Sequence, residues 1–249
     1  MMMTHSTSGS EPVPSESPFQ VRRWLPLGLL IAGLVLFFAL GWQRYVSFDM
    51  LRSYRGELMQ FVVAHRLLAP PVYMVAYAAI AAFSLPGGAV TTVLGGFLFG
   101  PYLGTVYVVI GATLGATLLF LVARTTLGAV LAARAGPFLH RTEAGFRENA
   151  LSYLLVLRLV PLFPFWLVNL VPAFLNVPLG TYVLGTFLGI IPGTFVFALV
   201  GSGLGGVLDA GRKPDFDVLF HGQVLLALVG LAVLALTPVA YKAFKAQKR

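Results

Sequence analysis

The stretch Arg158-Leu-Val-Pro-Leu-Phe-Pro-Phe-Trp-Leu-Val-Asn169 decides how this chain folds. Apolar sequence surrounds it from Leu151 to Leu175, and Pro161 and Pro164 interrupt that sequence near its centre. Proline ends or kinks a helix because it lacks a backbone N–H and its ring clashes with the preceding turn. The pattern therefore predicts two short apolar helices joined by a break, each too short to cross a hydrocarbon core of about 30 Å.

The composition of the chain places this break in a membrane protein. Of 249 residues, 58% are hydrophobic and 10% are charged, and the mean hydropathy is +0.86. The interior of a soluble domain of this size is too small to bury so much apolar surface. The formal charge is +8, but the 17 Lys and Arg lie mostly in short segments between apolar runs, which is typical of topology signals. Cysteine is absent, which excludes disulfides, thiolate nucleophiles and cysteine-bound metals.

A second break lies in the first half of the chain. Residues 67–123 contain no charge and no histidine, and Leu85-Pro86-Gly87-Gly88 interrupts them. This run is too long for two ordinary spans and short for three spans of about 20 residues each. A hairpin that enters and leaves on the same side, followed by a full span over 102–124, fits the length better. The corresponding full span of the second half is 178–201.

The two halves also share short motifs. Pro101-Tyr-Leu-Gly-Thr105 resembles Pro178-Leu-Gly-Thr181, and each motif follows a broken hairpin. Glycines about one turn apart let helix backbones approach closely in lipid. The glycines expected to pack in this way are Gly111, Gly115, Gly185, Gly189 and Gly193. The halves therefore predict an internal repeat, and chance similarity between apolar sequences is the alternative explanation.

The basic residues orient this repeat. With two re-entrant hairpins and four true spans, ten Lys and Arg fall on the side that holds both termini and residues 125–150, and six fall on the opposite side. The excess of positive charge predicts cytoplasmic termini. The hairpins then enter from opposite faces, so the repeat is inverted and its half-helices meet near the midplane, where transporter folds place their sites.

The predicted fold class is an all-α polytopic protein of the cell (inner or plasma) membrane. Its regions are a disordered cytoplasmic tail (1–20), an N-terminal transmembrane helix (21–45), an interfacial amphipathic segment (46–69), a membrane domain of two re-entrant hairpins and two spans (70–205), and a loop, a C-terminal transmembrane helix and a basic tail (206–249). A cleaved signal peptide is the alternative for the first apolar run. The long polar lead before that run, and the lack of a clear small-residue cleavage site, disfavour the signal peptide.

Three polar residues in the apolar sequence are candidates for substrate binding. An arginine at the bilayer centre costs roughly 2.5 to 3.5 kcal/mol, so the position of Arg158 requires an explanation. It either has a function, or it extends to the lipid headgroups or bonds to the carbonyls of its own hairpin. Asn169 and Arg158 are symmetric about the centre of the break and are expected to converge on one polar group, unless Asn169 caps the broken helix. Arg124, at the end of its span, is the third candidate, with an interfacial anchor as the alternative.

Covalent and metal chemistry have little support in this sequence. The chain has no phosphate-binding glycine loop and no histidine pair with metal spacing. Gly201-Ser-Gly203, with His221 beyond it, lacks the first glycine of a serine protease motif, because Val200 stands there. We expect no enzymatic activity, no metal, no cofactor and no nucleic acid; the expected partners are membrane lipids.

Taken together, these motifs resemble the SNARE-associated Golgi protein family, also called the VTT domain, a relative of bacterial DedA proteins. The resemblance covers about residues 70–205 and is carried by Leu85-Pro86-Gly87-Gly88, residues 95–100, Gly104, Gly111, Gly115, Arg124, Arg158, Pro161, Pro164, Asn169, Gly189 and Pro192-Gly193. It implies two opposed re-entrant hairpins, with Arg158 and Arg124 as site residues. For the wider superfamily it implies scrambling or flipping of phospholipids and polyprenyl phosphate carriers.

One departure from the DedA pattern matters for mechanism. DedA proteins typically place an acidic residue after the Pro-Gly of the first hairpin and a second arginine beyond the one that matches Arg158. This chain has Gly88 and the uncharged stretch 163–177 in those regions. Proton-coupled transport of the DedA kind is therefore not expected.

The sequence predicts translocation of phospholipid or polyprenyl-phosphate lipid, of the scramblase or flippase type. Two alternatives stay open: a transporter of a small anionic solute with Arg158 as its counter-ion, and a non-catalytic membrane scaffold. A scaffold would depend on residues 44–66 or 125–150 and would tolerate Arg158→Ala. Either kind of transport predicts the reverse.

Overall fold

The computed structural model describes residues 18–41, 48–126, 149–160 and 163–203, together with positions 226, 229, 230, 233 and 236. These residues form helices and no strand, which confirms the all-α prediction for this part of the chain. The helices are α1 (Pro18–Ala39), α2 (Phe48–Ala64), α3 (Ala69–Ala82), α4 (Gly88–Thr126), α7 (Ala150–Leu159), α8 (Phe165–Phe174) and α9 (Leu179–Ser202). The predictions for the first 17 residues, Pro161, most of the connector 125–150 and the last span lie outside the described residues.

Within the described ranges, α4 and α9 are long and apolar enough to cross a membrane. α4 is kinked at Gly100, whose φ of 78° favours glycine, and Pro101 begins the next helical stretch without needing an amide donor. At a rise of 1.5 Å per residue, residues 101–126 extend about 39 Å and α9 about 36 Å. Each therefore exceeds the roughly 30 Å of a hydrocarbon core.

The other apolar helices are shorter. α3 has 14 residues, and α7 and α8 have 10 each, which corresponds to about 21 Å and about 15 Å. The apolar part of α1, Trp24–Ala39, is also shorter than a span. The N-terminal transmembrane helix expected over 21–45 therefore stays a prediction.

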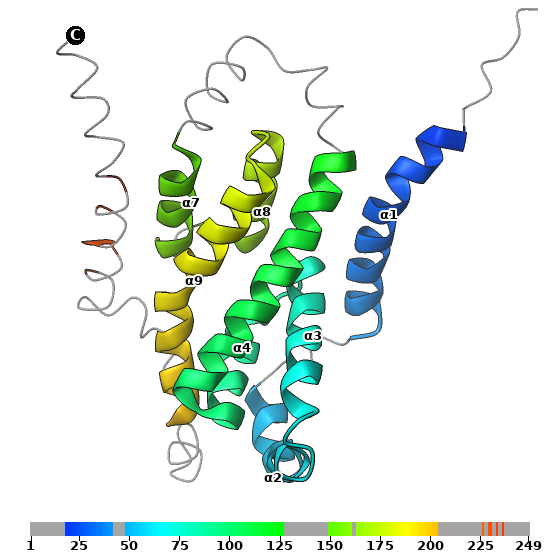
Figure 1. Ribbon diagram of the computed structural model, residues 1–249. Coiled ribbons are helices and arrows are strands. Elements are labelled where there is room, and N and C mark those ends of the chain that lie inside the picture. Colours follow the sequence, from blue (N-terminus) through cyan, green and yellow to red (C-terminus); the bar gives the residue numbers. More distant parts are fainter. Residues whose placement is uncertain are drawn as a thin grey trace, which may run out of the picture.

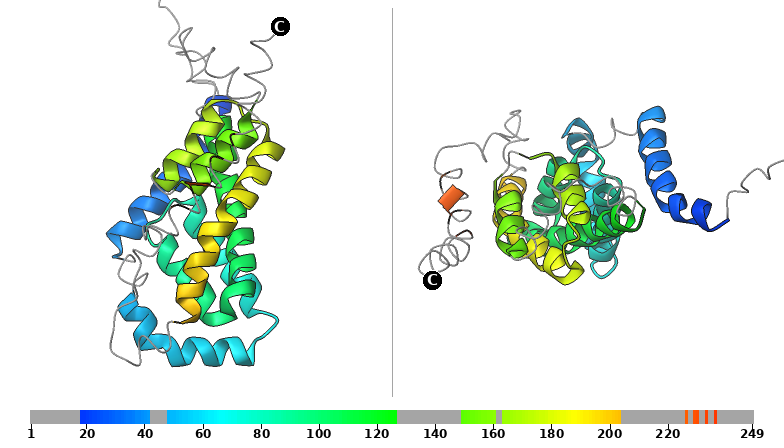
Figure 2. Two further views of the ribbon diagram at one scale, coloured as in Figure 1. Left: turned by 90° about the vertical axis from the view of Figure 1, so that its left-hand side faces the viewer. Right: turned by 90° about the horizontal axis from the view of Figure 1, so that it is seen from above.

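Two short helical hairpins lie at opposite ends of the bundle (Figure 1). α3 runs from the end near α2 to the middle, and the first part of α4 returns to the same end before the kink at Gly100. α7 runs from the other end to the middle, α8 returns, and α9 then passes along the length of the bundle beside α4, as the turned view of Figure 2 also shows. Both halves thus have the order short, short, long.

Most of the predicted glycines lie where helices pack closely. A Cβ on Gly111 would meet the backbone of Met74 in α3, and one on Gly115 would meet the carbonyl of Ala78. Gly185 faces Leu154 in α7, and a Cβ on Gly189 would lie 2.6 Å from the Cβ of Arg158. Gly193 differs from its predicted packing role, because a Cβ there would meet nothing within 4 Å. Two unpredicted contacts, of Gly96 with Ala198 and of Gly201 with Val93, bring α4 against the end of α9.

Tyrosine hydroxyls close the first hairpin. The Tyr73 hydroxyl donates to the carbonyl of Thr91 at 2.7 Å, and the Tyr77 hydroxyl lies 2.9 Å from Thr92 Oγ1. Both tyrosines are on α3 and both threonines are near the start of α4. The strained residue Ser84, with φ of 50°, lies in the connection between the two helices.

Candidate functional site

Arg158 lies in the last turn of α7, directly before the break of the second hairpin. Its Nη2 donates to Asn169 Oδ1 at 2.7 Å, to the Tyr182 hydroxyl at 3.1 Å and to Thr186 Oγ1 at 3.0 Å. Asn169 belongs to α8, and Tyr182 and Thr186 belong to α9. One guanidinium therefore joins all three helices of the second half at the depth where the hairpin turns.

The acceptors around this guanidinium are themselves fixed by burial and hydrogen bonds. Asn169 and Tyr182 have no exposed surface. The Tyr182 hydroxyl lies 2.8 Å from Asn169 Oδ1 and 3.2 Å from the carbonyl of Ala116 in α4, either of which can accept its proton. The Tyr182 ring stacks on Phe120 with centroids 4.1 Å apart. This packing preorganises the acceptors, so Arg158 is held in one place.

The site keeps a surplus of positive charge and hydrogen-bond donors. Arg158 Nε and Asn169 Nδ2 are buried and have no hydrogen-bond partner among the described residues. The acidic residues in the described ranges, Asp49 and Glu57, both lie on α2. The Arg158 guanidinium carbon lies 5.7 Å from the centroids of both the Phe165 and Tyr182 rings, which attract a cation without neutralising it. Such an arrangement suits an anionic ligand.

Arg124 has a different environment. It lies in the last turn of α4, where its Nη1 donates to the carbonyl of Val177 at 3.4 Å and its guanidinium lies 5.9 Å from the Phe120 ring. Among the described residues its polar contacts are with Val177 and Phe120 and not with Arg158, so the structure brings Asn169 to Arg158 but leaves Arg124 apart. Val177 lies between α8 and α9, and Arg124 therefore fixes the connection between them.

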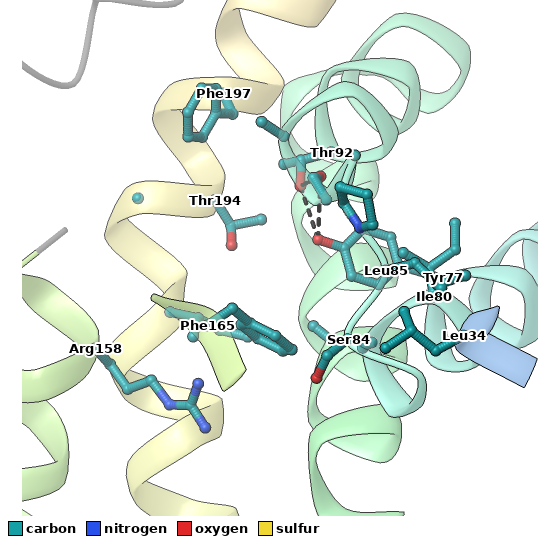
Figure 3. A pocket seen from close by; sticks show the side chains of 18 of the residues that line it. Leu34, Tyr77, Ile80, Ser84, Leu85, Thr92, Arg158, Phe165, Thr194 and Phe197 are labelled. Carbon is teal, nitrogen blue, oxygen red and sulfur yellow. Dashed lines mark hydrogen bonds between the residues drawn. The ribbon is translucent and has the colours of Figure 1, made fainter. Parts of the chain in front are cut away.

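A cavity of about 700 Å³ lies beside Arg158. In Figure 3 Arg158 and Phe165 face it from one side and Ser84, Leu85 and Leu34 from the other. Both hairpins, α1 and α9 contribute to its wall. The wall comprises Leu34, Phe38, Tyr77, Ile80, Ala81, Ser84–Ala89, Thr92, Ala112, Arg158, Phe165, Ile190, Gly193, Thr194 and Phe197. Its volume falls within the range of about 300 to 1,000 Å³ that ligand pockets have.

Two helix N-termini reach the same cavity. α4 begins at Gly88 and α8 at Phe165, and both residues are part of the wall. The amides of a first helical turn have no acceptor within their own helix and carry partial positive charge. Together with Arg158, these helix ends make the cavity electropositive on two sides. No group of three metal-ligating side chains occurs in the described part of the chain.

Arg158 and Asn169 are candidates from the sequence, whereas Tyr182, Thr186 and Ser84 become candidates only in the structure. Tyr182 and Thr186 are four residues apart, as are the glycines Gly185 and Gly189 on the same helix. Polar residues at helical spacing beside packing glycines mark a helix face turned toward other helices. That spacing is the signal that could have found the two acceptors.

Comparison with known proteins identifies the domain that holds this site. The family model of the VTT domain matches residues 85–203, which include Arg158, Asn169, Tyr182 and Thr186. The chain is 32% identical to transmembrane protein 41B of Danio rerio over 180 residues and 31% identical to that of Homo sapiens. It is 31% identical to the transmembrane protein 41 homolog of Dictyostelium discoideum over 185 residues.

These alignments cover 71% to 73% of this chain but only 53% to 61% of the three relatives. The chain therefore spans somewhat more than half the length of the proteins that it matches. No solved structure matches it.

Proposed function

Because this chain is a member of the VTT-domain family of membrane proteins, we propose that it translocates lipid between leaflets without covalent chemistry. The headgroup would pass the cavity beside Arg158, so its charge would not have to cross hydrocarbon without polar partners. One observation carries the proposal: the half-buried guanidinium of Arg158, whose Nε is fully buried and which has no described carboxylate partner, faces a cavity of about 700 Å³.

The proposal places both hairpins in the membrane as re-entrant elements. α3, α7 and α8 are too short to cross, and the two hairpins turn near the middle of the bundle from opposite ends (Figure 1). Broken helices in a membrane are tolerated where they line a cavity or pack in protein. Under the charge distribution derived above, the second hairpin enters from the cytoplasmic face and the first from the opposite face.

Arg158 and the helix N-termini would lower the barrier for an anionic headgroup. Moving a charged group from water into hydrocarbon is strongly unfavourable without compensating partners. A guanidinium can bind phosphate at two points, and the amides of a helix N-terminus add donors. The anchoring bonds to α8 and α9 hold the cation at the midplane, so these donors do not have to be assembled as each headgroup arrives.

Reconstituted protein tests this function directly. Liposomes that contain a headgroup-labelled phospholipid are treated with an impermeant bleaching reagent, without ATP and without an ion gradient. We expect almost complete bleaching with the wild-type protein and about half in protein-free vesicles, because about half of the label faces inward when no lipid crosses. Arg158→Ala is expected to return bleaching to the protein-free level.

Arg158→Lys is the matched variant, since it keeps the charge but loses the planar fork of the guanidinium. We expect partial activity from it, with circular dichroism and membrane insertion unchanged in both variants. Full activity of Arg158→Ala would contradict the proposal. Half bleaching with the wild type, together with uptake of a small anion that depends on Arg158, would replace lipid translocation by solute transport. A scaffold would show neither activity.

A further inference from the structure

The cavity beside Arg158 has an apolar end that a headgroup bound at Arg158 would not occupy. Leu34 and Phe38 of α1 form part of that end, together with Ile80 and Leu85 of the first hairpin. Figure 3 shows Leu34 across the cavity from Arg158, with Phe165 and Ser84 between them. An apolar cavity takes hydrocarbon in preference to water, because water needs polar partners and hydrocarbon supplies dispersion contacts.

α1 separates this apolar end from the surroundings. Its outward side chains are largely exposed, with Leu29 at 62%, Val35 at 60% and Leu36 at 55%. A helix with such a surface lies against lipid in a membrane protein. α1 is also outside the matched VTT domain, which begins at residue 85. One face of α1 therefore borders the cavity and the others border the hydrocarbon of the membrane.

The contact that holds α1 in place is narrow. Gly33 packs against the ring of Phe83, and Phe37 is 6% exposed. Gly28, the other glycine within α1, has nothing within 4 Å of a Cβ. In lipid the hydrophobic effect does not drive helices together, so a helix held by a short close contact separates at low cost. Phe83 directly precedes the strained Ser84, which places this contact at the break of the first hairpin.

We infer that the cavity binds one hydrocarbon chain of a phospholipid whose headgroup lies at Arg158, and that the chain enters between α1 and the first hairpin. The inference rests on the proposed function, because that function sets the headgroup at Arg158. It assigns a substrate-binding role to Leu34, Phe38, Ile80 and Leu85, which carry no polar group. It also assigns to α1 the role of a movable outer wall.

Two buried alanines allow a selective test. Ala81 and Ala112 line the cavity and are 4% and 6% exposed, so bulk lipid reaches neither of them. The full-length protein is reconstituted with a phosphatidylglycerol that carries a photoreactive diazirine in its acyl chain, irradiated, and mapped by mass spectrometry. We expect cross-links in the peptides that contain Ala81 and Ala112.

Leu34→Trp fills the cavity from α1, and Leu36→Trp, which makes the same change on the exposed side of the helix, is its control. We expect cross-links at Ala81 and Ala112 to fall several-fold in Leu34→Trp and to stay at the wild-type level in Leu36→Trp. Circular dichroism and elution volume report whether each variant folds. If Leu34→Trp does not fold, Gly33→Leu takes its place: it wedges α1 away from Phe83 and should raise the cross-linking, with Gly28→Leu as its control.

Absence of these cross-links in the wild type, or an equal yield in the cavity variant and its control, would overturn the chain site. Cross-links of the expected pattern in a protein that moves no lipid would leave the chain site standing and remove the translocation function. Translocation that proceeds without these cross-links would leave the translocation function standing and remove the chain site.

Discussion

The two hairpins share an order of elements but differ in what holds them together. In the first, the hydroxyls of Tyr73 and Tyr77 bond to Thr91 and Thr92, so the link between α3 and α4 is neutral. In the second, Arg158 bonds to one acceptor on α8 and two on α9. A neutral pair is satisfied within itself, whereas the guanidinium retains a full charge that no described carboxylate neutralises.

We infer from this difference that the two hairpins have different roles. The neutral bonds of the first hairpin hold one side of the cavity wall in place, and no charged group there would bind an anionic ligand. The second hairpin holds a cation whose position in a membrane is energetically unfavourable, and binding of an anion would offset part of that cost. Both hairpins border the same cavity, which lets one serve as support and the other as the charged site.

The largest expected effect concerns the faces from which the hairpins enter. Single cysteines at Leu67 and Tyr102, which are 94% and 75% exposed and flank the first hairpin, should both be labelled from the non-cytoplasmic face only. Cysteines at Asn149 and Gly180, which flank the second hairpin, should be labelled from the cytoplasmic face only. The natural absence of cysteine makes the background low. Labelling of Leu67 and Tyr102 from different faces would make the first hairpin an ordinary crossing.

Asn169→Asp tests whether the unneutralised charge is what distinguishes the second hairpin. A carboxylate at this position would pair with Arg158 across the 2.7 Å contact, and charge-assisted hydrogen bonds are roughly twice as strong as neutral ones. We expect translocation to fall about tenfold or more, which corresponds to ~1.4 kcal/mol of lost interaction with the headgroup. Thermal stability in detergent should be retained or should rise. Wild-type activity in this variant would show that the free charge is not used.

Tyr182→Phe and Tyr73→Phe compare one hydroxyl from each half. Removal of the Tyr182 hydroxyl takes away an acceptor of Arg158 and a neighbour of Asn169, and we expect a several-fold loss of translocation. Removal of the Tyr73 hydroxyl breaks one neutral bond, which costs about 0.5 to 1.5 kcal/mol of stability and leaves translocation near the wild-type level. Thermal unfolding and the liposome assay measure both. Equal losses of translocation in the two variants would contradict the inference that the two hairpins have different roles.

Gly189→Ala is the mildest test of how the second hairpin is positioned. The added Cβ would lie 2.6 Å from the Cβ of Arg158, so α7 has to shift away from α9. Overpacking of this kind costs about 1 to 3 kcal/mol, and we expect a lower unfolding temperature and a modest loss of translocation. Gly180→Ala on the same helix, where a Cβ meets nothing within 4 Å, should change neither. An unaffected Gly189→Ala would mean that the spacing of α7 and α9 does not position Arg158.

Several elements could be predicted because local rules control them. Prolines and glycines end helices through their own backbones, so Pro86-Gly87-Gly88 and Pro164 mark the breaks whatever surrounds them. The glycines of α4 and α9 signalled close helix contacts for a similar reason, since small side chains matter most where helices touch in lipid. Gly193 is the exception: its spacing was right, but it lies on the wall of the cavity, and spacing alone does not say which neighbour a residue faces.

The order of residues along the chain is enough to show that the protein is helical and apolar, where its helices break, and that Arg158 and Asn169 lie symmetrically about one break. The packing of the helices was needed to show that Tyr182 and Thr186 join Arg158, that Arg124 does not, and that α1 forms part of the cavity wall. These two kinds of information differ because the interactions behind them differ in range. Breaks depend on neighbours within one helical turn, whereas a cavity and a hydrogen-bond cluster depend on helices that the chain connects only through distant residues.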